Sequence, residues 1–227
     1  FPERLESELS YRLSPEQREL LDDVLAYARE LVQDLSGGTL RQRVRWWSAL
    51  ALLRTLSSSP AAATATLRSR ASTLGAPDET SVDELGRRSV LDQGDSEEAD
   101  ELDLTPGSDW APEDKNHWTR LQAFAARSEG LKGKGDTKLK AAAKIVGQLL
   151  EEGYHPIVFC RFIHTAEYLA EELRKILKKG TEVIAVTGLL APAEREQRVD
   201  GLGASPRRVL VCTDCLSEGI NLQKWFN

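Results

Sequence analysis

The sequence predicts an α/β fold: a parallel sheet flanked by helices, preceded by an all-helical segment. Short apolar runs at residues 157–160, 182–186 and 209–212 are typical of strands, and amphipathic helical patterns separate them. Strands that alternate with helices pair in parallel through crossover connections. The first 75 residues show helical periodicity. Together these features are typical of nucleotide-binding architectures.

Three helices are expected in the N-terminal part. Residues 14–17 (Ser-Pro-Glu-Gln) form a capping-box pattern with proline at the first helical position. This helix should end near Leu35, before Gly37 and Gly38. A third helix should run from Pro60 to about residue 71. The second, residues 39–56, should pack through Trp46, Trp47, Leu50 and Leu53.

Basic residues lie beside two tryptophans in the second helix. Arg41, Arg43 and Arg45 precede Trp46 and Trp47. Such a pattern can bind nucleic acid, and it is also typical of a solvated arginine face over a buried tryptophan pair.

Charge divides the chain into three parts. Residues 76–116 hold 14 Asp and Glu against 3 Lys and Arg, a balance of -11, although the whole chain carries only -6. The remainder is therefore mildly basic, which is compatible with a polyanionic partner. We expect a helical segment over 1–75, a flexible acidic linker over 76–116 with a short helix near 82–91, and an α/β domain over 117–227.

Four further helices are expected in the C-terminal part. They cover residues 118–126, about 137–152, 165–177 and 192–202, and Asp136 provides a cap for the second of them. Gly153 should stop that helix.

The most informative stretch is residues 207–223. Its uninterrupted apolar run, 209–212, indicates a fully buried strand, and Thr213 and Asp214 follow at the carboxyl end. Ligands bind at those ends in open parallel sheets. Gly219 permits a close backbone approach. The alternative is an ordinary strand followed by a polar turn.

The sequence lacks the motifs of several common nucleotide-binding and metal-binding sites. The sequence contains neither a Gly-x-x-x-x-Gly-Lys-Ser/Thr phosphate loop nor a Gly-x-Gly-x-x-Gly after a strand, and residues 130–138 lack the required spacing. Cys212 and Cys215 have the spacing of a metal-binding pair, but the sequence contains no second cysteine pair, and the three histidines show no ligand spacing. We therefore expect no metal site. The cysteine usage and the absence of a signal peptide favour a cytoplasmic setting. Because the chain contains no Met, we expect a piece of a longer protein.

Three ordered segments carry a resemblance to a known family: Ile-Val-Phe-Cys-Arg-Phe-Ile from 157, Val-Thr-Gly from 186 with Glu194 and Arg195, and Cys-Thr-Asp-Cys-Leu-Ser-Glu-Gly-Ile-Asn-Leu-Gln from 212. They resemble motifs IV, IVa and V of the second RecA-like lobe, the C-terminal domain, of superfamily-two helicases. Gly-Ile-Asn-Leu from 219 is similar to the Swi/Snf-type DNA translocase branch, and the Ser-Glu pair before it resembles bacterial members.

The resemblance implies functional roles for nine residues. Those implied at the nucleotide cleft are Asp214, Gly219 and Asn221. Those implied to contact nucleic acid are Arg161, Phe162, Thr187, Gly188, Arg195 and Thr213. Structural alternatives stay open: Phe162 in the core, Arg161 and Arg195 in ion pairs, and Asp214 as a turn cap.

The resemblance implies a motor lobe that is incomplete by itself. Its family binds ATP and Mg²⁺ mainly through a first lobe, which would precede Phe1, and takes an arginine finger from a motif that would follow Asn227. We expect duplex DNA as the partner, with RNA open, and no ATP hydrolysis by this chain alone. A non-catalytic α/β interaction module with a helical partner surface is the alternative, and a flavodoxin-like nucleotide-binding domain is a weaker one.

Overall fold

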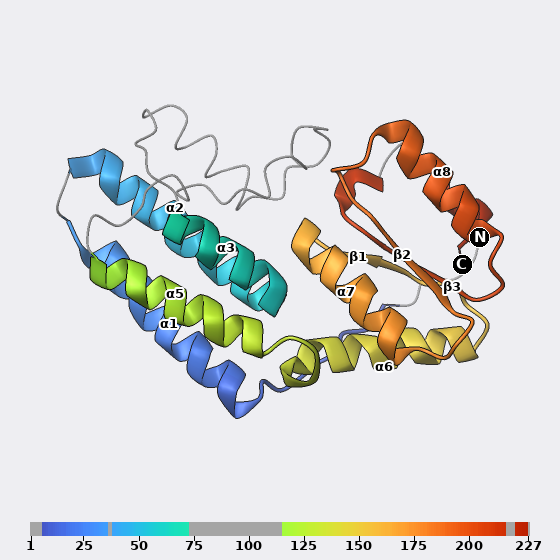
Figure 1. Ribbon diagram of the computed structural model, residues 1–227, viewed down its shortest axis with the longest axis horizontal. Coiled ribbons are helices and arrows are strands. Elements are labelled where there is room, and N and C mark those ends of the chain that lie inside the picture. The colour runs from blue at the N-terminus through green and yellow to red at the C-terminus, as the bar shows by residue number, and fades with distance from the viewer. Residues whose placement is uncertain (1–5, 36–37, 73–114, 217–220, 227) are drawn as a thin grey trace.

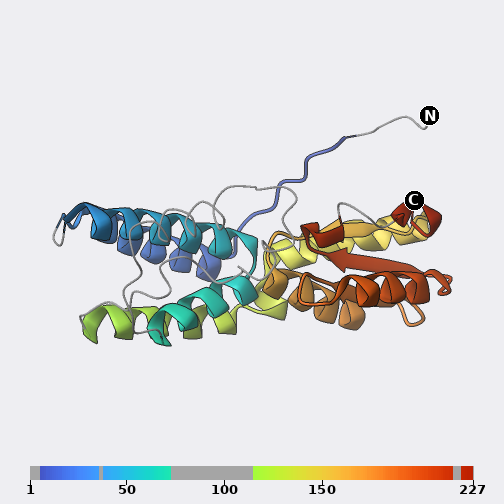
Figure 2. The ribbon, with the colours of Figure 1, turned by 90° about the horizontal axis from the view of Figure 1, so that it is seen from above.

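The computed structural model describes residues 6–35, 38–72, 115–216 and 221–226. Two bodies lie end to end: a helical bundle of α1, α2, α3 and α5, and an α/β lobe that begins at Asp136 (Figures 1 and 2). The acidic tract predicted over 76–116, with its short helix near 82–91, falls almost entirely outside the described residues.

The helical bundle contains the three predicted N-terminal helices and one that comes later in the chain. Its members are α1 (Pro15–Gln33), α2 (Gly38–Ser58), α3 (Pro60–Ser72) and α5 (Lys115–Gly130). The sequence-based division assigned residues 117–130 to the α/β domain, whereas α5 contributes Leu121 and Phe124 to the bundle core. In that core the Tyr27 ring meets the Phe124 ring edge-on, with centroids 5.8 Å apart.

The start of α1 confirms the predicted capping box. The Gln17 amide donates to Ser14 Oγ at 3.2 Å, and the Ser14 amide donates to Gln17 Oε1 at 3.0 Å. The predicted end near Leu35 is wrong by two residues, because Asp34 already adopts an extended conformation.

The predicted packing face of α2 is confirmed for Leu53, which packs against the bundle core, and wrong for Trp46 and Leu50. Trp46 and Leu50 are 51% and 38% exposed, while Val44 and Leu52 are buried. Apolar residues occur on more than one side of this helix, so their spacing alone does not select the buried side. The exposed Trp46 also rules out a tryptophan pair that is buried as a unit.

The α/β lobe contains the predicted three-stranded parallel sheet. Its strands are β1 (Ile157–Phe159), β2 (Glu182–Val186) and β3 (Arg208–Cys212), in the order β1-β3-β2. The helices are α6 (Thr137–Glu151), α7 (Ile163–Ile176) and α8 (Pro192–Gly203). Three short 3₁₀ turns accompany them: η2 (Gly133–Gly135), η3 (Asp214–Leu216) and η4 (Leu222–Lys224).

The sheet lies between two layers of helices. Side chains of α6 and α7 form one core with Val183, Val209 and Val211, and α8 forms another with Leu210 and Cys212 on the opposite face. This layering confirms the predicted fold class, a parallel sheet flanked by helices. The side chains of β3 enter the two cores alternately, because successive side chains of a strand point to opposite faces.

The burial of the strands follows their position in the sheet. All of Val209, Leu210, Val211 and Cys212 are 0% exposed, which confirms the fully buried strand predicted from the apolar run. The first strand is less buried than its apolar run suggests, because Ile157 and Val158 are half-buried and Phe159 is 51% exposed. Among the described strands β1 pairs with β3 alone, so one of its edges is open.

Polar contacts join the bundle to the lobe. The Thr165 hydroxyl on α7 shares hydrogen bonds with those of Ser58 and Ser59 at 2.9 and 2.8 Å. Ala61 of α3 packs into the core of the lobe. The end of α2 is thereby fixed against the beginning of α7.

Candidate nucleic-acid interface

The carboxyl ends of all three strands meet at one edge of the sheet. Phe159 and Val186 both lie in register with Cys212. Beyond the strands, the Cys160 amide donates to the Cys212 carbonyl at 2.7 Å, and the Thr213 amide donates to the Val186 carbonyl at 3.3 Å. These bonds hold the three strand exits, the residues that directly follow β1, β2 and β3, at one edge of the sheet. Parallel sheets bind ligands at this edge.

The first exit carries Arg161 and Phe162, both half-buried. Phe162 has an extended backbone (φ -112°, ψ 136°) and precedes α7. Its carbonyl accepts bonds from the amides of Thr165 and Ala166, each at 3.0 Å. The local backbone therefore fixes where this aromatic residue leaves the sheet.

The second exit carries Thr187 and Gly188, and a buried arginine holds it. Arg195 Nε donates to the Leu190 carbonyl at 2.7 Å, and an Arg195 Nη donates to the Gly188 carbonyl at 3.0 Å. Arg195 is 8% exposed and Thr187 is 4% exposed. In this conformation the Arg195 guanidinium shapes the loop after β2, and its contact with nucleic acid stays a prediction.

The third exit carries Thr213 and Asp214, which differ in accessibility. Thr213 is 1% exposed, and its hydroxyl donates to Cys215 Sγ at 3.4 Å. Asp214 is exposed and begins η3, directly after the buried strand. Asp214 is thus exposed at the edge, whereas the Thr213 hydroxyl reaches a phosphate only if its surroundings move.

The last two predicted cleft residues follow this exit. Gly219 lies outside the described residues. Asn221 is exposed and precedes η4. The structure therefore brings together the three pairs that leave the strands, and Arg195 holds the pair that follows β2.

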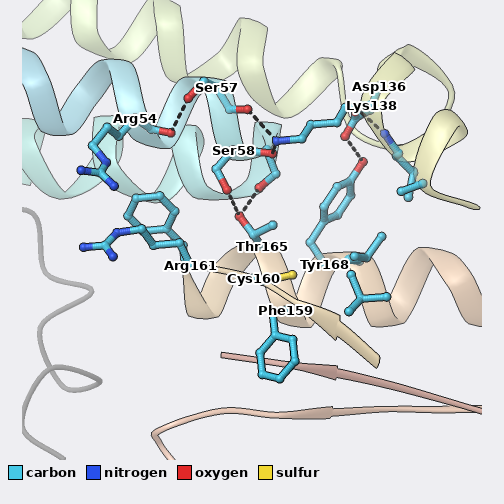
Figure 3. A pocket seen from close by; sticks show the side chains of 16 residues that line it. Arg54, Ser57, Ser58, Asp136, Lys138, Phe159, Cys160, Arg161, Thr165 and Tyr168 are labelled. Atoms are coloured by element: carbon cyan, nitrogen blue, oxygen red, sulfur yellow. Dashed lines mark hydrogen bonds between the residues drawn. The ribbon is translucent and has the colours of Figure 1, made fainter. Parts of the chain in front are cut away.

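A pocket of about 380 Å³ adjoins the first exit and was not predicted from the sequence (Figure 3). Arg54 and the serines that follow it on α2 line one side, and Arg161, Phe162 and Thr165 line the other. These residues are more than 100 positions apart in the sequence. A run of serines at the end of a helix carries no signal for such a pocket.

Lys138 lines both this pocket and a second one. Lys138 Nζ donates to the carbonyls of Ser57 and Ser58 at 2.9 and 3.2 Å, at the carboxyl end of α2. An ammonium is favourable there because the final carbonyls of a helix lack partners within the helix. Burial raises the pKa of the Cys160 thiol, which also lines the pocket, to about 11.

In the part of the chain that the structure describes, the helices lack the length and apolarity of a membrane span. Nor do these residues contain a group of three or more His, Cys, Asp or Glu side chains that could hold a metal ion.

Comparison with known proteins gives one match. Residues 137–225 match the family described as helicase conserved C-terminal domain. No curated protein and no solved structure matches the chain significantly. The matched segment covers β1, β2 and β3 with the helices between them, so it coincides with the α/β lobe and contains all three strand exits. The match supports assigning the lobe as a helicase-family C-terminal motor lobe.

Proposed function

We propose that the α/β lobe is the C-terminal lobe of an ATP-dependent nucleic-acid motor, a superfamily-two translocase of the Swi/Snf type from the bacterial branch, acting on duplex DNA in the cytoplasm. One observation carries the proposal. The segment that matches the helicase C-terminal domain folds as a parallel sheet whose carboxyl edge gathers the residues of the three helicase-like motifs.

The exits suit two different tasks at this edge. Arg161 supplies a cation beside the aromatic Phe162, and cations beside aromatics suit a nucleic-acid strand. The amide of Gly188 lies in a loop that Arg195 fixes from behind. Backbone amides and cations are typical phosphate contacts that position a strand without reading its sequence. The exposed Asp214 lies at the third exit, where it would face the nucleotide cleft.

The proposal requires a second lobe for the chemistry. Phosphoryl transfer needs a phosphate-binding loop, Mg²⁺ and a cation that stabilises the transferred phosphoryl group. The sequence contains no phosphate loop. ATP and Mg²⁺ would therefore be held mainly by a separate lobe, and closure of the cleft between the lobes would move the gripped strand.

The experiment is phosphate release by the purified chain, with and without duplex DNA, against a longer protein that carries a phosphate-loop lobe. We expect no turnover from the chain alone and DNA-stimulated turnover when both lobes are present. Turnover by the chain alone that survives repeated purification would overturn the proposal.

A non-catalytic interaction module is the second candidate. The exposed Trp46 and Leu50 favour it, because they lie one turn apart on α2 and present apolar surface. Co-purification of a protein partner that Trp46→Ala abolishes, without DNA-stimulated turnover in the longer protein, would favour this candidate over the motor.

A further inference from the structure

The pocket between α2 and α7 draws on residues outside the helicase match. Arg54 and Ser57 come from the bundle, whereas the match begins at residue 137. Its volume of about 380 Å³ lies within the range of small-ligand pockets, about 300–1,000 Å³. Residues of both bodies therefore line one cavity of ligand size.

The inner lining of this pocket is apolar and uncharged. Leu139, Val158 and Leu169 line it. Cys160 lies among them, and burial keeps its thiol protonated by raising its pKa to about 11. Such a surface favours an uncharged group, because an unpartnered charge would lose its hydration there.

The mouth is cationic. Arg54 and Arg161 lie at the same end of the pocket in Figure 3, and Lys138 reaches across its other side. Among the described lining residues Asp136 carries the one carboxylate. That side chain is 3% exposed and accepts bonds from the Leu139 amide and the Tyr168 hydroxyl. The described lining therefore carries three cationic side chains against one buried carboxylate.

An aromatic ring lines the pocket beside this cationic end. Phe162 is half-buried, and its place is fixed by the start of α7. A nucleobase stacks on such a ring irrespective of its sequence, and guanidinium groups bind the attached phosphate through paired hydrogen bonds.

We propose that the pocket takes one nucleotide unit, with its base against Phe162 and the apolar lining and its phosphate at Arg54 and Arg161. The unit belongs to a nucleic-acid strand, because Arg161 also lies at the carboxyl edge of the sheet; this part rests on the proposed function. Free mononucleotide is the other source of the same chemistry.

The experiment measures binding to the 227-residue chain of a fluorescein-labelled single-stranded oligonucleotide, by anisotropy at two salt concentrations, and of AMP, by calorimetry. Arg54→Ala should weaken oligonucleotide binding about tenfold and reduce the salt slope by about one. Phe162→Leu should weaken it about tenfold with the salt slope unchanged. Lys144→Ala removes the same charge from the exposed side of α6 and should change the affinity less than about twofold.

Three outcomes separate the alternatives. If the chain binds AMP but not the oligonucleotide, the pocket is a nucleotide site whose ligand is a free mononucleotide and not a unit of a strand. Equal affinities for Arg54→Ala and Lys144→Ala, in variants with unchanged thermal melting, would overturn the proposal, as would a wild-type chain that binds neither ligand. The phosphate-release experiment is independent, because it measures turnover with both lobes present.

Discussion

The hydroxyl of Tyr168 on α7 donates to a carboxylate oxygen of Asp136 at 3.1 Å. The other oxygen of Asp136 accepts from the Leu139 amide at 3.0 Å and so caps α6. The Gly133 amide donates to the Tyr168 hydroxyl at 2.8 Å. One buried carboxylate therefore ties the start of α6 to α7. Both Asp136 and Tyr168 line the pocket, and α7 directly follows the first strand exit.

Asp136→Ala should destabilise the chain through this pair. It removes a cap that is worth about 1 kcal/mol and leaves a buried hydroxyl without its acceptor, which costs about 1–3 kcal/mol more. Urea unfolding of Asp136→Ala, Tyr168→Phe and the double variant measures the coupling. If the two single effects simply add, the hydrogen bond contributes nothing and the tie is incidental.

Arg195→Ala tests whether Arg195 shapes the loop after β2 or contacts nucleic acid. The variant leaves the carbonyls of Gly188 and Leu190 without their donor, so we expect a loss of about 1–3 kcal/mol in the free energy of unfolding. Nucleic-acid affinity should fall with an unchanged salt slope. A stable variant with a shallower slope would instead identify Arg195 as a phosphate contact.

Stability should fall at alkaline pH because of two buried thiols. Burial raises the pKa of Cys160 from 9.0 to about 11, and it raises the pKa of Cys212 as well. A raised thiol pKa means that the folded state holds the proton more tightly. The stabilisation is full below the unfolded pKa and is lost as pH rises toward the folded value, by about 1.4 kcal/mol per pH unit for each thiol.

Urea unfolding at several pH values between neutrality and pH ~11 measures this loss. Cys160→Ala and Cys212→Ala should each flatten the curve, whatever their effect at neutral pH. Curves that stay parallel to that of the wild-type chain would show that the thiols do not titrate during unfolding.

Asp214→Ala, made in a protein that carries both lobes, tests the nucleotide-cleft role. The carboxylate is exposed at the end of a strand whose other side chains form the core. Thermal melting should therefore change little, while nucleic-acid-stimulated ATP hydrolysis falls, because cleft closure depends on contacts across this edge. A variant that melts early and keeps full turnover would make Asp214 a turn cap.

The sequence predicted the lobe well because its signals are local. The apolar run of β3 is followed at once by polar residues, and Asp136 directly precedes an amphipathic helix. Each of these patterns predicts a buried strand or a helix cap from neighbouring residues alone. The open edge of β1 was missed, because the number of strand neighbours is a property of the sheet and not of the run itself.

The tertiary features of the candidate site could not be predicted for the same reason. Arg54 lines the same pocket as Arg161 and Phe162, and the hydrogen bonds of Thr165 with Ser58 and Ser59 help to hold the two bodies together there. The burial of Thr187 and Thr213 likewise depends on what packs around the strand exits. A motif shows which residues leave a strand, and the packing decides which of them are accessible.

The central claim is that nucleic acid binds at the carboxyl edge of the sheet. The most direct measurement is amide chemical-shift mapping of the chain as duplex DNA is added. We expect perturbed amides at residues 160–162, 187–189 and 213–214. Residues 154–156, 180–182 and 205–207 at the amino ends of the same strands should not shift. Perturbations confined to those amino ends, or to the exposed face of α2 around Trp46, would contradict the claim.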